Sequence, residues 1–175
     1  LGKTYEKISS EINHLLEEGF RVLVLAGTKE KIYDQLNLGA YALGYVVLAN
    51  PIRENAKSTF NYFAEQGVNI KVISGDNPQT VSAVAKRAGI TGAERFIDAN
   101  LLKTKEDLDQ AVESYTVFGR VTPDQKRRLV QALKRKDHTV AMTGDGVNDI
   151  LAMKSADCSI AMASGSDAAT QVAQV

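Results

Sequence analysis

The sequence contains no tryptophan, only three prolines and a single cysteine in 175 residues. Because a disulfide needs two cysteines, Cys158 cannot form one within the chain, and a reducing compartment is expected. No apolar run is long enough for a membrane helix: the longest, residues 40–49, contains a glycine, whereas a spanning helix needs about 20 apolar residues. The charged, helix-like N-terminus also differs from a secretory signal.

The sequence also lacks an excess of charge of either sign. Lysine plus arginine and aspartate plus glutamate each number 21, so the formal net charge is zero. A neutral chain has no bulk attraction to nucleic acid or to an anionic membrane, and no nucleic-acid partner is expected. Apolar residues make up 44% of the chain and charged residues 24%, which is typical of a soluble globular protein.

The first fifty residues predict a helix followed by two strands. Ile8, Ile12 and Leu15 recur at helical spacing, and Gly19 ends the pattern. Residues 21–27 and 40–50 are then rich in Val, Leu and Tyr, as β-strands are, and the two could pair as antiparallel neighbours.

After Asn50-Pro51 the pattern changes to an alternation of short strands and helices. Strands are expected over residues 68–74, 116–120, 138–142 and 158–163, and helices over residues 56–66, 77–88, 122–137, 147–156 and 165–175. This alternation predicts an α/β fold with a mainly parallel sheet and helices on both faces. The domain boundary is therefore placed at Asn50-Pro51, which gives domains of residues 1–49 and 50–175.

Polar residues gather where the predicted parallel strands end. They are Ser74-Gly75-Asp76-Asn77, then Gly119-Arg120 with Lys126 in the following helix, then Thr143-Gly144-Asp145-Gly146 with Asn148 and Asp149, and finally residues 163–167. Ligands of open α/β sheets bind at this edge, so these side chains are expected to form one site.

The residue types at this edge indicate phosphoryl chemistry. Ser74 and the amides around Gly75 can donate hydrogen bonds to an anionic oxygen, and Lys126 supplies a positive charge. Asp145 and Asp149 are hard oxygen ligands suited to Mg²⁺, which commonly takes one or two carboxylates together with phosphate and water. Phosphate donors and magnesium ligands together are the parts that phosphoryl transfer needs.

Each feature also has a simpler interpretation. Residues 74–77 alone make a good turn, and Lys126 alone would be a solvated helix charge. Two glycines and two acids between a buried strand and a helix are harder to explain, because one glycine suffices for a turn. A dinucleotide fingerprint is disfavoured, because Asp149 occupies the place of its third glycine and Asp145 would face a pyrophosphate.

Three motifs together resemble one known family. The segments ISGDNPQT (residues 73–80), GRVTPDQK (119–126) and TGDGVND (143–149) resemble, in order and spacing, those of P-type cation-transporting ATPases, which belong to the haloacid dehalogenase-like superfamily. LANPIR (48–53) resembles the hinge between the nucleotide-binding and phosphorylation domains, and EEGFRVLVLA (17–26) resembles the last part of the nucleotide-binding domain. The resemblance implies a Rossmann-like phosphorylation domain over residues 50–175, preceded by a partial α+β nucleotide-binding domain.

The resemblance also implies a role for each matching residue. Ser74 and Gly75 would hold the transferred phosphoryl group, Lys126 would neutralise it, and Asp145 would coordinate Mg²⁺. Asn148 and Asp149 would complete the metal motif and position its neighbours. The residues implied to lie at the ATP nucleotide are Arg21, Asp76 and Arg120.

The sequence departs from the family pattern at three places. The hinge has Asn50-Pro51 where Asp-Pro is usual, and Ser74 stands where Thr is common. The family's nucleophile is the Asp of an Asp-Lys-Thr-Gly segment, and the sequence contains no such segment. It is expected to precede Leu1 in a longer protein, together with an actuator domain and membrane helices.

The sequence is thus interpreted as a fragment of a P-type ATPase at the cytosolic face of a membrane, in which ATP hydrolysis through an aspartyl-phosphate drives cation transport. The fragment itself is expected to be inactive, and without its central strand it is expected to be marginally stable or to self-associate. Two alternatives stay open: a soluble phosphatase of the same superfamily, and a non-catalytic Mg²⁺- or nucleotide-binding module.

Overall fold

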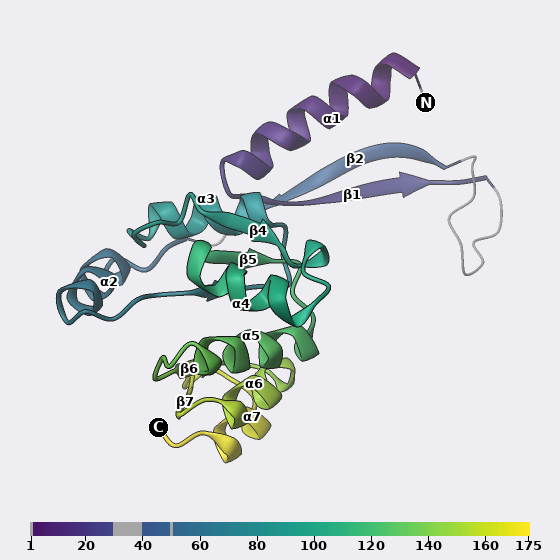
Figure 1. Ribbon diagram of the computed structural model, residues 1–175. Coiled ribbons are helices and arrows are strands. Elements are labelled where there is room, and N and C mark those ends of the chain that lie inside the picture. The colour runs from purple at the N-terminus through teal and green to yellow at the C-terminus, as the bar shows by residue number, and fades with distance from the viewer. Residues whose placement is uncertain (1, 30–39, 50) are drawn as a thin grey trace.

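The computed structural model describes residues 2–29, 40–49 and 51–175, and within these ranges the side chains of all residues except 2–8 and 17. A long helix and a two-stranded ribbon extend from one end of the molecule, and the remaining helices and strands form two stacked α/β parts (Figure 1). No helix in these ranges is both long and apolar enough to cross a membrane.

The N-terminal helix and the ribbon form as the sequence predicts. Helix α1 spans Gly2–Glu17, and Gly19 follows it with a φ of +83°, a left-handed conformation that glycine adopts readily. Strand β1 (Arg21–Gly27) pairs with β2 (Tyr41–Leu48) in antiparallel register, which confirms the predicted pairing.

The ribbon leaves its apolar side chains uncovered by the described residues. Every residue of β2 is exposed, and none of β1 is fully buried. The exposed large side chains are Leu23, Val24, Leu25, Tyr41, Leu43, Tyr45, Val46, Val47 and Leu48. An isolated two-stranded ribbon is only marginally stable in water, and exposed apolar patches are typical of contact surfaces.

The parallel strands form two sheets. One has the order β3 (Val72–Ile73), β5 (Val117–Gly119) and β4 (Phe96–Asp98), and the other pairs β6 (Ala141–Gly144) with β7 (Cys158–Ala161). All pairs are parallel, which confirms that part of the prediction. Within the described residues, however, no ladder joins β3 to β6, so the single predicted sheet is interrupted between them.

The strands differ most from the prediction in three places. The strand expected over 68–74 is reduced to Val72–Ile73, and the one expected over 138–142 moves to Ala141–Gly144. Strand β4 was missed, because three residues are too short for a periodic pattern to be visible.

Most helices begin where the sequence supplies a cap. They are α2 (Ala56–Glu65), α3 (Pro78–Arg87), α4 (Lys105–Ser114), α5 (Pro123–Arg135), α6 (Ile150–Ser155) and α7 (Asp167–Val172), with short 3₁₀ helices η1 (Ala99–Leu101) and η2 (Val147–Asp149). Asn77 and Ser166 cap α3 and α7, and Thr104 and Thr122 form capping boxes on α4 and α5. The helix expected over 147–156 is divided into η2 and α6.

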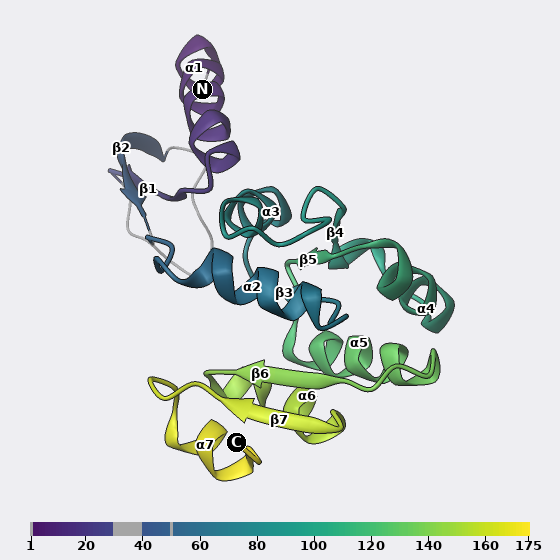
Figure 2. The same cartoon turned by 90° about the vertical axis from the view of Figure 1, so that its left-hand side faces the viewer.

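Helix α5 lies between the two sheets and packs on both of them (Figure 2). On one face, Leu129 and Ala132 join the core around Phe118 of β5. On another face, Val130 joins the core around Met142 of β6, with Met153 of α6. Because no backbone ladder joins the two sheets in the part of the chain that the structure describes, this helix connects the two halves of the fold.

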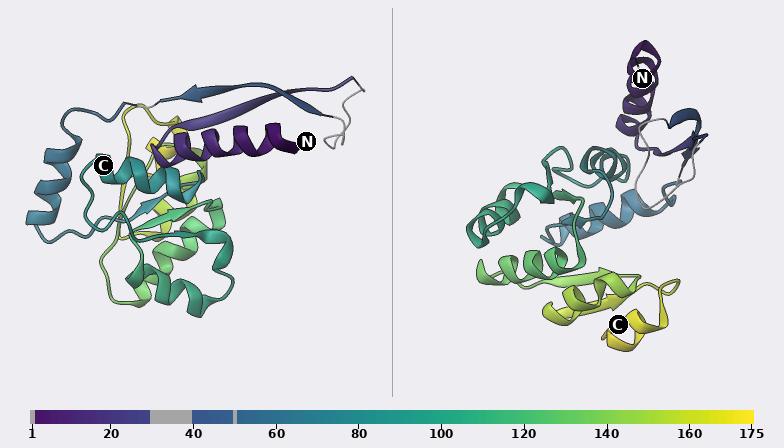
Figure 3. Two further views of the ribbon diagram at one scale, coloured as in Figure 1. Left: turned by 90° about the horizontal axis from the view of Figure 1, so that it is seen from above. Right: turned by 90° about the vertical axis from the view of Figure 1, so that its right-hand side faces the viewer.

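The N-terminal part contacts the rest of the chain through α3, and Figure 3 shows α1 running beside the ribbon. A β-carbon at Gly19 would lie 3.0 to 3.4 Å from side-chain atoms of Arg87, Val84 and Ala83, so the turn after α1 packs closely on that helix. Asn50 of the predicted boundary lies outside the described residues, and the division into domains 1–49 and 50–175 stays a prediction.

Candidate functional site

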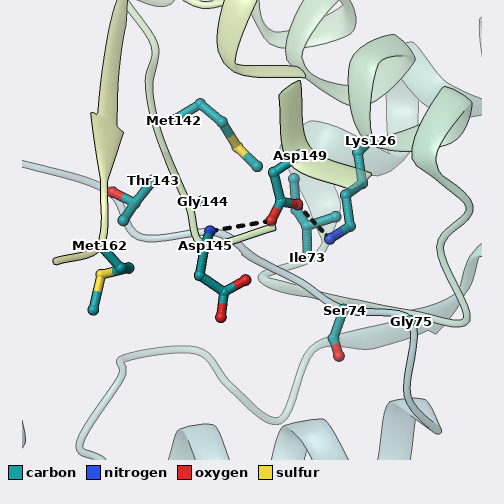
Figure 4. Close-up of a pocket in the computed structure, with 10 residues that line it drawn as sticks. All are labelled: Ile73, Ser74, Gly75, Lys126, Met142, Thr143, Gly144, Asp145, Asp149 and Met162. Carbon is teal, nitrogen blue, oxygen red and sulfur yellow. Dashed lines mark hydrogen bonds and ion pairs between the residues drawn. The ribbon is translucent and has the colours of Figure 1, made fainter. Parts of the chain in front are cut away.

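A pocket of about 290 Å³ lies between the carboxyl ends of β3 and β6 (Figure 4). Its lining residues come from β3, β6, the loops after β3, β6 and β7, and helices α5 and η2, and they are Ile73, Ser74, Gly75, Lys126, Met142, Thr143, Gly144, Asp145, Asp149 and Met162. The pocket therefore brings together five residues for which the sequence predicts a catalytic or metal-binding role, namely Ser74, Gly75, Lys126, Asp145 and Asp149.

The loop after β3 forms one wall of the pocket and is fixed by short hydrogen bonds. The Ser74 amide donates to the Phe118 carbonyl at 2.9 Å, and the Ser74 hydroxyl accepts from the Asp76 amide at 3.1 Å. A β-carbon on Gly75 would meet only the Val121 carbonyl, at 3.8 Å, so packing does not require glycine there. The glycine instead leaves open space in the pocket wall, where a ligand can approach the backbone.

The opposite wall is organised by the buried carboxylate of Asp149. Its Oδ1 lies 2.6 Å from Lys126 Nζ, and its Oδ2 accepts from the amides of Asp145 and Gly146, both at 3.3 Å. The Lys126 and Asp149 side chains are only 15% and 8% exposed. Asp149 thus orients the lysine and the loop at the same time, a role that the sequence reasoning assigned to it only in part.

Gly144 is required by this arrangement. A β-carbon at that position would lie 2.5 Å from Cβ of Asp149 and 2.9 Å from Sδ of Met153. Only a glycine lets the end of β6 approach the helix that carries the carboxylate. The unusual glycine content of this motif therefore has a packing cause at Gly144, whereas at Gly146 a β-carbon would meet nothing closer than 4.0 Å.

The carboxylate of Asp145 is exposed and is drawn in Figure 4 pointing into the space between the two walls. It makes no hydrogen bond or ion pair with any side chain that the structure describes, so it is available to a cation. Among the same residues, no cluster of three or more His, Cys, Asp or Glu side chains could hold a metal ion. The donor set fits Mg²⁺ that keeps water or phosphate ligands, and it does not form a complete protein cage.

Asn148 is the one predicted catalytic residue that does not line the pocket. It lies on η2, next to Asp149, with an exposed side chain. Its assigned place in the motif stays a prediction.

The three residues assigned to the nucleotide also lie close together. Arg21 Nη1 lies 3.9 Å from Asp76 Oδ1, and the Arg120 amide donates to the Asp76 carbonyl at 2.8 Å. Arg120 Nη1 donates to Asp98 Oδ2 at 2.7 Å. The sequence reasoning missed Asp98 because it missed β4, the strand that Asp98 ends.

Asp98 is held as a carboxylate by its surroundings. The Asn100 amide hydrogen bond is the main cause that lowers the pKa of the Asp98 carboxyl; burial opposes it, and the hydrogen bond and charge of Arg120 lower the pKa further. The available sequence signal was the Asp98-Ala-Asn100 turn, in which an Asp side chain caps the backbone two residues on.

Comparison with known proteins identifies the family of this chain. The family model described as haloacid dehalogenase-like hydrolase matches residues 6–157. The chain belongs to the haloacid dehalogenase-like hydrolase family. The predicted superfamily and its α/β fold with parallel strands are thereby confirmed.

Among curated proteins, this haloacid dehalogenase-like chain is similar to cation-transporting ATPases. It is 46% identical over 168 residues to a probable cation-transporting ATPase of Streptococcus pneumoniae, covering 94% of this chain and 22% of that protein. It is 50% identical over 160 residues to the calcium-transporting ATPase CtpE of Mycobacterium tuberculosis, covering 90% and 20%. The chain thus spans about a fifth of the length of these relatives, and the resemblance seen in its three motifs is confirmed.

A solved structure supports the fold of the haloacid dehalogenase-like chain. A zinc-transporting PIB-type ATPase superposes with a TM-score of 0.62 and 24% identity, covering 96% of this chain and 22% of that one. At this identity the likeness concerns the fold alone, and the roles of single site residues stay predictions.

Proposed function

We propose that this chain is part of the cytosolic portion of a P-type ATPase that couples ATP hydrolysis to cation transport across a membrane. The observation that carries the proposal is the match of at least 90% of the chain to about a fifth of several cation-transporting ATPases. The pocket supports it, because it gathers phosphate donors, a lysine and carboxylates at one edge of the strands.

In this proposal the chain supplies the electrostatic part of phosphoryl transfer. Ser74 and the amides near Gly75 bind the oxygens of the transferred group, and Lys126 neutralises their charge. Asp149 holds the Lys126 amine in place, with its Oδ1 2.6 Å from Nζ. Asp145 would bind Mg²⁺, which when present offsets phosphate charge and orients the reacting groups.

The covalent step needs a carboxylate from outside the sequence. An Asp oxygen would attack the terminal phosphorus of ATP, the bond to the bridging oxygen would break, and ADP would leave with that electron pair. The resemblance implies that this Asp ends a strand between β3 and β6. The interruption of the sheet at that place, and the pocket lying there, support this proposal.

We assign residues 1–49 to the end of a nucleotide-binding domain and residues 50–175 to the phosphorylation domain. The exposed apolar faces of β1 and β2 support this division, because a two-stranded ribbon of this composition fits the edge of a larger sheet. The remainder of the same polypeptide would cover them. Arg21, at the start of β1, reaches Asp76 of the second part and would bring the nucleotide phosphates toward the pocket.

The test compares the 175-residue chain with a version extended upstream through the Asp-Lys-Thr-Gly strand and the complete nucleotide-binding domain. Incubated with Mg²⁺ and ATP labelled on its terminal phosphate, the extended protein should become labelled on the new Asp, and the shorter chain should not. In the extended protein, Lys126→Ala and Asp145→Asn should each slow labelling by roughly a hundredfold, the scale of one preorganised contact. Lys134→Ala is the matched control and should label normally, because Lys134 lies on the same helix but pairs with Asp157 and does not line the pocket.

Two results would count against these roles. Label on Asp145 or Asp76 of the shorter chain would show that one of them is a nucleophile. Hydrolysis of small phosphate esters by a complete protein without membrane helices would identify a soluble phosphatase of the same family instead.

A further inference from the structure

The carboxyl end of β4 lies directly beside the turn that carries Arg120. Strands β4 and β5 pair in parallel (Figure 1), with Asp98 opposite Gly119, the last residue of β5. Arg120 follows Gly119 and is therefore within reach of the Asp98 side chain. The Asp98 carboxylate accepts from Arg120 Nη1 at 2.7 Å. Its side chain is 21% exposed, whereas that of Arg120 is 50% exposed, so the more buried partner anchors the more exposed one.

The backbone of Arg120 is held in an uncommon conformation. Its φ is +53°, in the left-handed region that residues other than glycine adopt rarely. The Arg120 amide donates to the Asp76 carbonyl at 2.8 Å, and the Val121 amide donates to the Ser74 carbonyl at 2.9 Å. The turn is therefore fastened to the same loop that forms a wall of the pocket, which fixes the direction in which Arg120 leaves the backbone.

The other arginine of this region is held much less firmly. Arg21 Nη1 lies 3.9 Å from Asp76 Oδ1, and these side chains are 65% and 55% exposed. Of the two arginines assigned to the nucleotide, one is thus fixed by a short hydrogen bond and a constrained backbone, and the other can adjust.

We propose that Asp98 is a positioning residue of the nucleotide site, which holds the Arg120 guanidinium ready for the phosphates of a nucleoside polyphosphate. This inference rests on the proposed function, because it needs Arg120 to contact nucleotide. A guanidinium has five N–H donors, and the hydrogen bond to Asp98 uses one of them. Ordering a long side chain before binding removes part of the entropy loss that binding would otherwise cause.

Asp98 also has an opposing effect, which makes the sign of the test informative. Its negative charge repels phosphate, so removing the carboxylate would tighten binding if repulsion dominated. At physiological ionic strength, counter-ions weaken the repulsion between exposed charges more than they weaken the direct hydrogen bond. We therefore expect positioning to dominate and binding to weaken when the charge is removed.

The test measures equilibrium binding of ATP to the complete protein at about 0.15 M salt, with EDTA present so that no turnover occurs. The variants are Asp98→Asn, Arg120→Ala and the two combined. Asp98→Asn retains an oxygen that can accept from the Asn100 amide, so the cap of η1 survives. Asp109→Asn is the matched control, because Asp109 pairs with Arg135 on the surface of α4 and α5, in a pair that does not involve the site.

Asp98→Asn should raise the dissociation constant of ATP about two- to fivefold, the range for a partly exposed ion pair. The change should vanish in the Arg120→Ala background, and Asp109→Asn should leave binding unchanged. If Arg120→Ala weakens binding and Asp98→Asn does not, or tightens it, the inference fails and the nucleotide role of Arg120 stands. An equal loss with and without Arg120 would reveal a merely structural residue. If Arg120→Ala has no effect, the nucleotide role of Arg120 and the inference fail together.

Discussion

The buried pair of Lys126 and Asp149 should dominate the stability of the region around the pocket. Lys126→Met retains the apolar stem and removes the charge, which leaves a carboxylate that is 8% exposed with only two amide donors at 3.3 Å. Removing one partner of a buried pair typically costs about 3–5 kcal/mol, because the other charge stays buried and uncompensated. For a chain of this size each kcal/mol lowers the melting temperature by about 2–4 °C.

The matched comparison is Lys134→Met on the same helix. Lys134 Nζ lies 2.7 Å from Asp157 Oδ1, but these side chains are 39% and 37% exposed, so the expected loss is about 1 kcal/mol or less. Urea unfolding of both variants measures the difference directly. Adding Asp149→Asn to Lys126→Met should restore part of the loss, because a neutral amide is less costly to bury than an unpaired carboxylate. Equal losses for the two lysines would refute the argument from burial.

Three further outcomes are expected. Gly119→Ala should lower the melting temperature, because its β-carbon would lie 2.5 Å from backbone atoms of Pro78; Gly67→Ala is a useful contrast, since nothing lies within 4 Å of that position and only its φ of +74° opposes the change. Stability should fall in acid. The Thr104 backbone hydrogen bond lowers the pKa of the Asp107 carboxyl. The stability gained from this shift is present above the unfolded-state pKa near 4 and is lost as the pH falls through the folded-state pKa. Asp107→Asn should therefore flatten this part of a titration of melting temperature against pH. The chain alone should bind Mg²⁺ with a dissociation constant of roughly millimolar or weaker in calorimetry, since phosphate completes such sites, and micromolar binding would instead indicate a self-sufficient metal site.

The elements with strong local signals were predictable from the sequence. Helix α5 has Thr122 as its cap, Pro123 at its first position and an apolar face, and the structure has it there. The ribbon pairing also follows from two apolar runs of suitable length. Strand β4 and the shortened β3 were not predictable, because strands of two or three residues are defined by pairing with β5 and not by their own pattern.

The candidate site was predictable as a set of residues and less so as a geometry. Ser74, Lys126 and Asp145 could be grouped because each follows a parallel strand or begins the next helix. The sequence could not show that Asp149 is bound by Lys126 while Asp145 is not, because both acids occur in one short motif. The two carboxylates differ in burial, since Asp149 is buried and Asp145 is exposed. That difference depends on how η2 packs against α5.

The interrupted sheet leads to a final expectation about assembly. Among the described residues, β3 pairs only with β5 and β6 only with β7, so one edge of each strand has no ladder partner, and unpaired edges favour pairing with another chain. The 175-residue chain should therefore show a melting temperature that depends on protein concentration. A version extended to include a strand between β3 and β6 should melt higher and lose that dependence, because one strand would satisfy both edges. A sharply cooperative melt of a strict monomer, unchanged on dilution and on extension, would contradict this view of the fold.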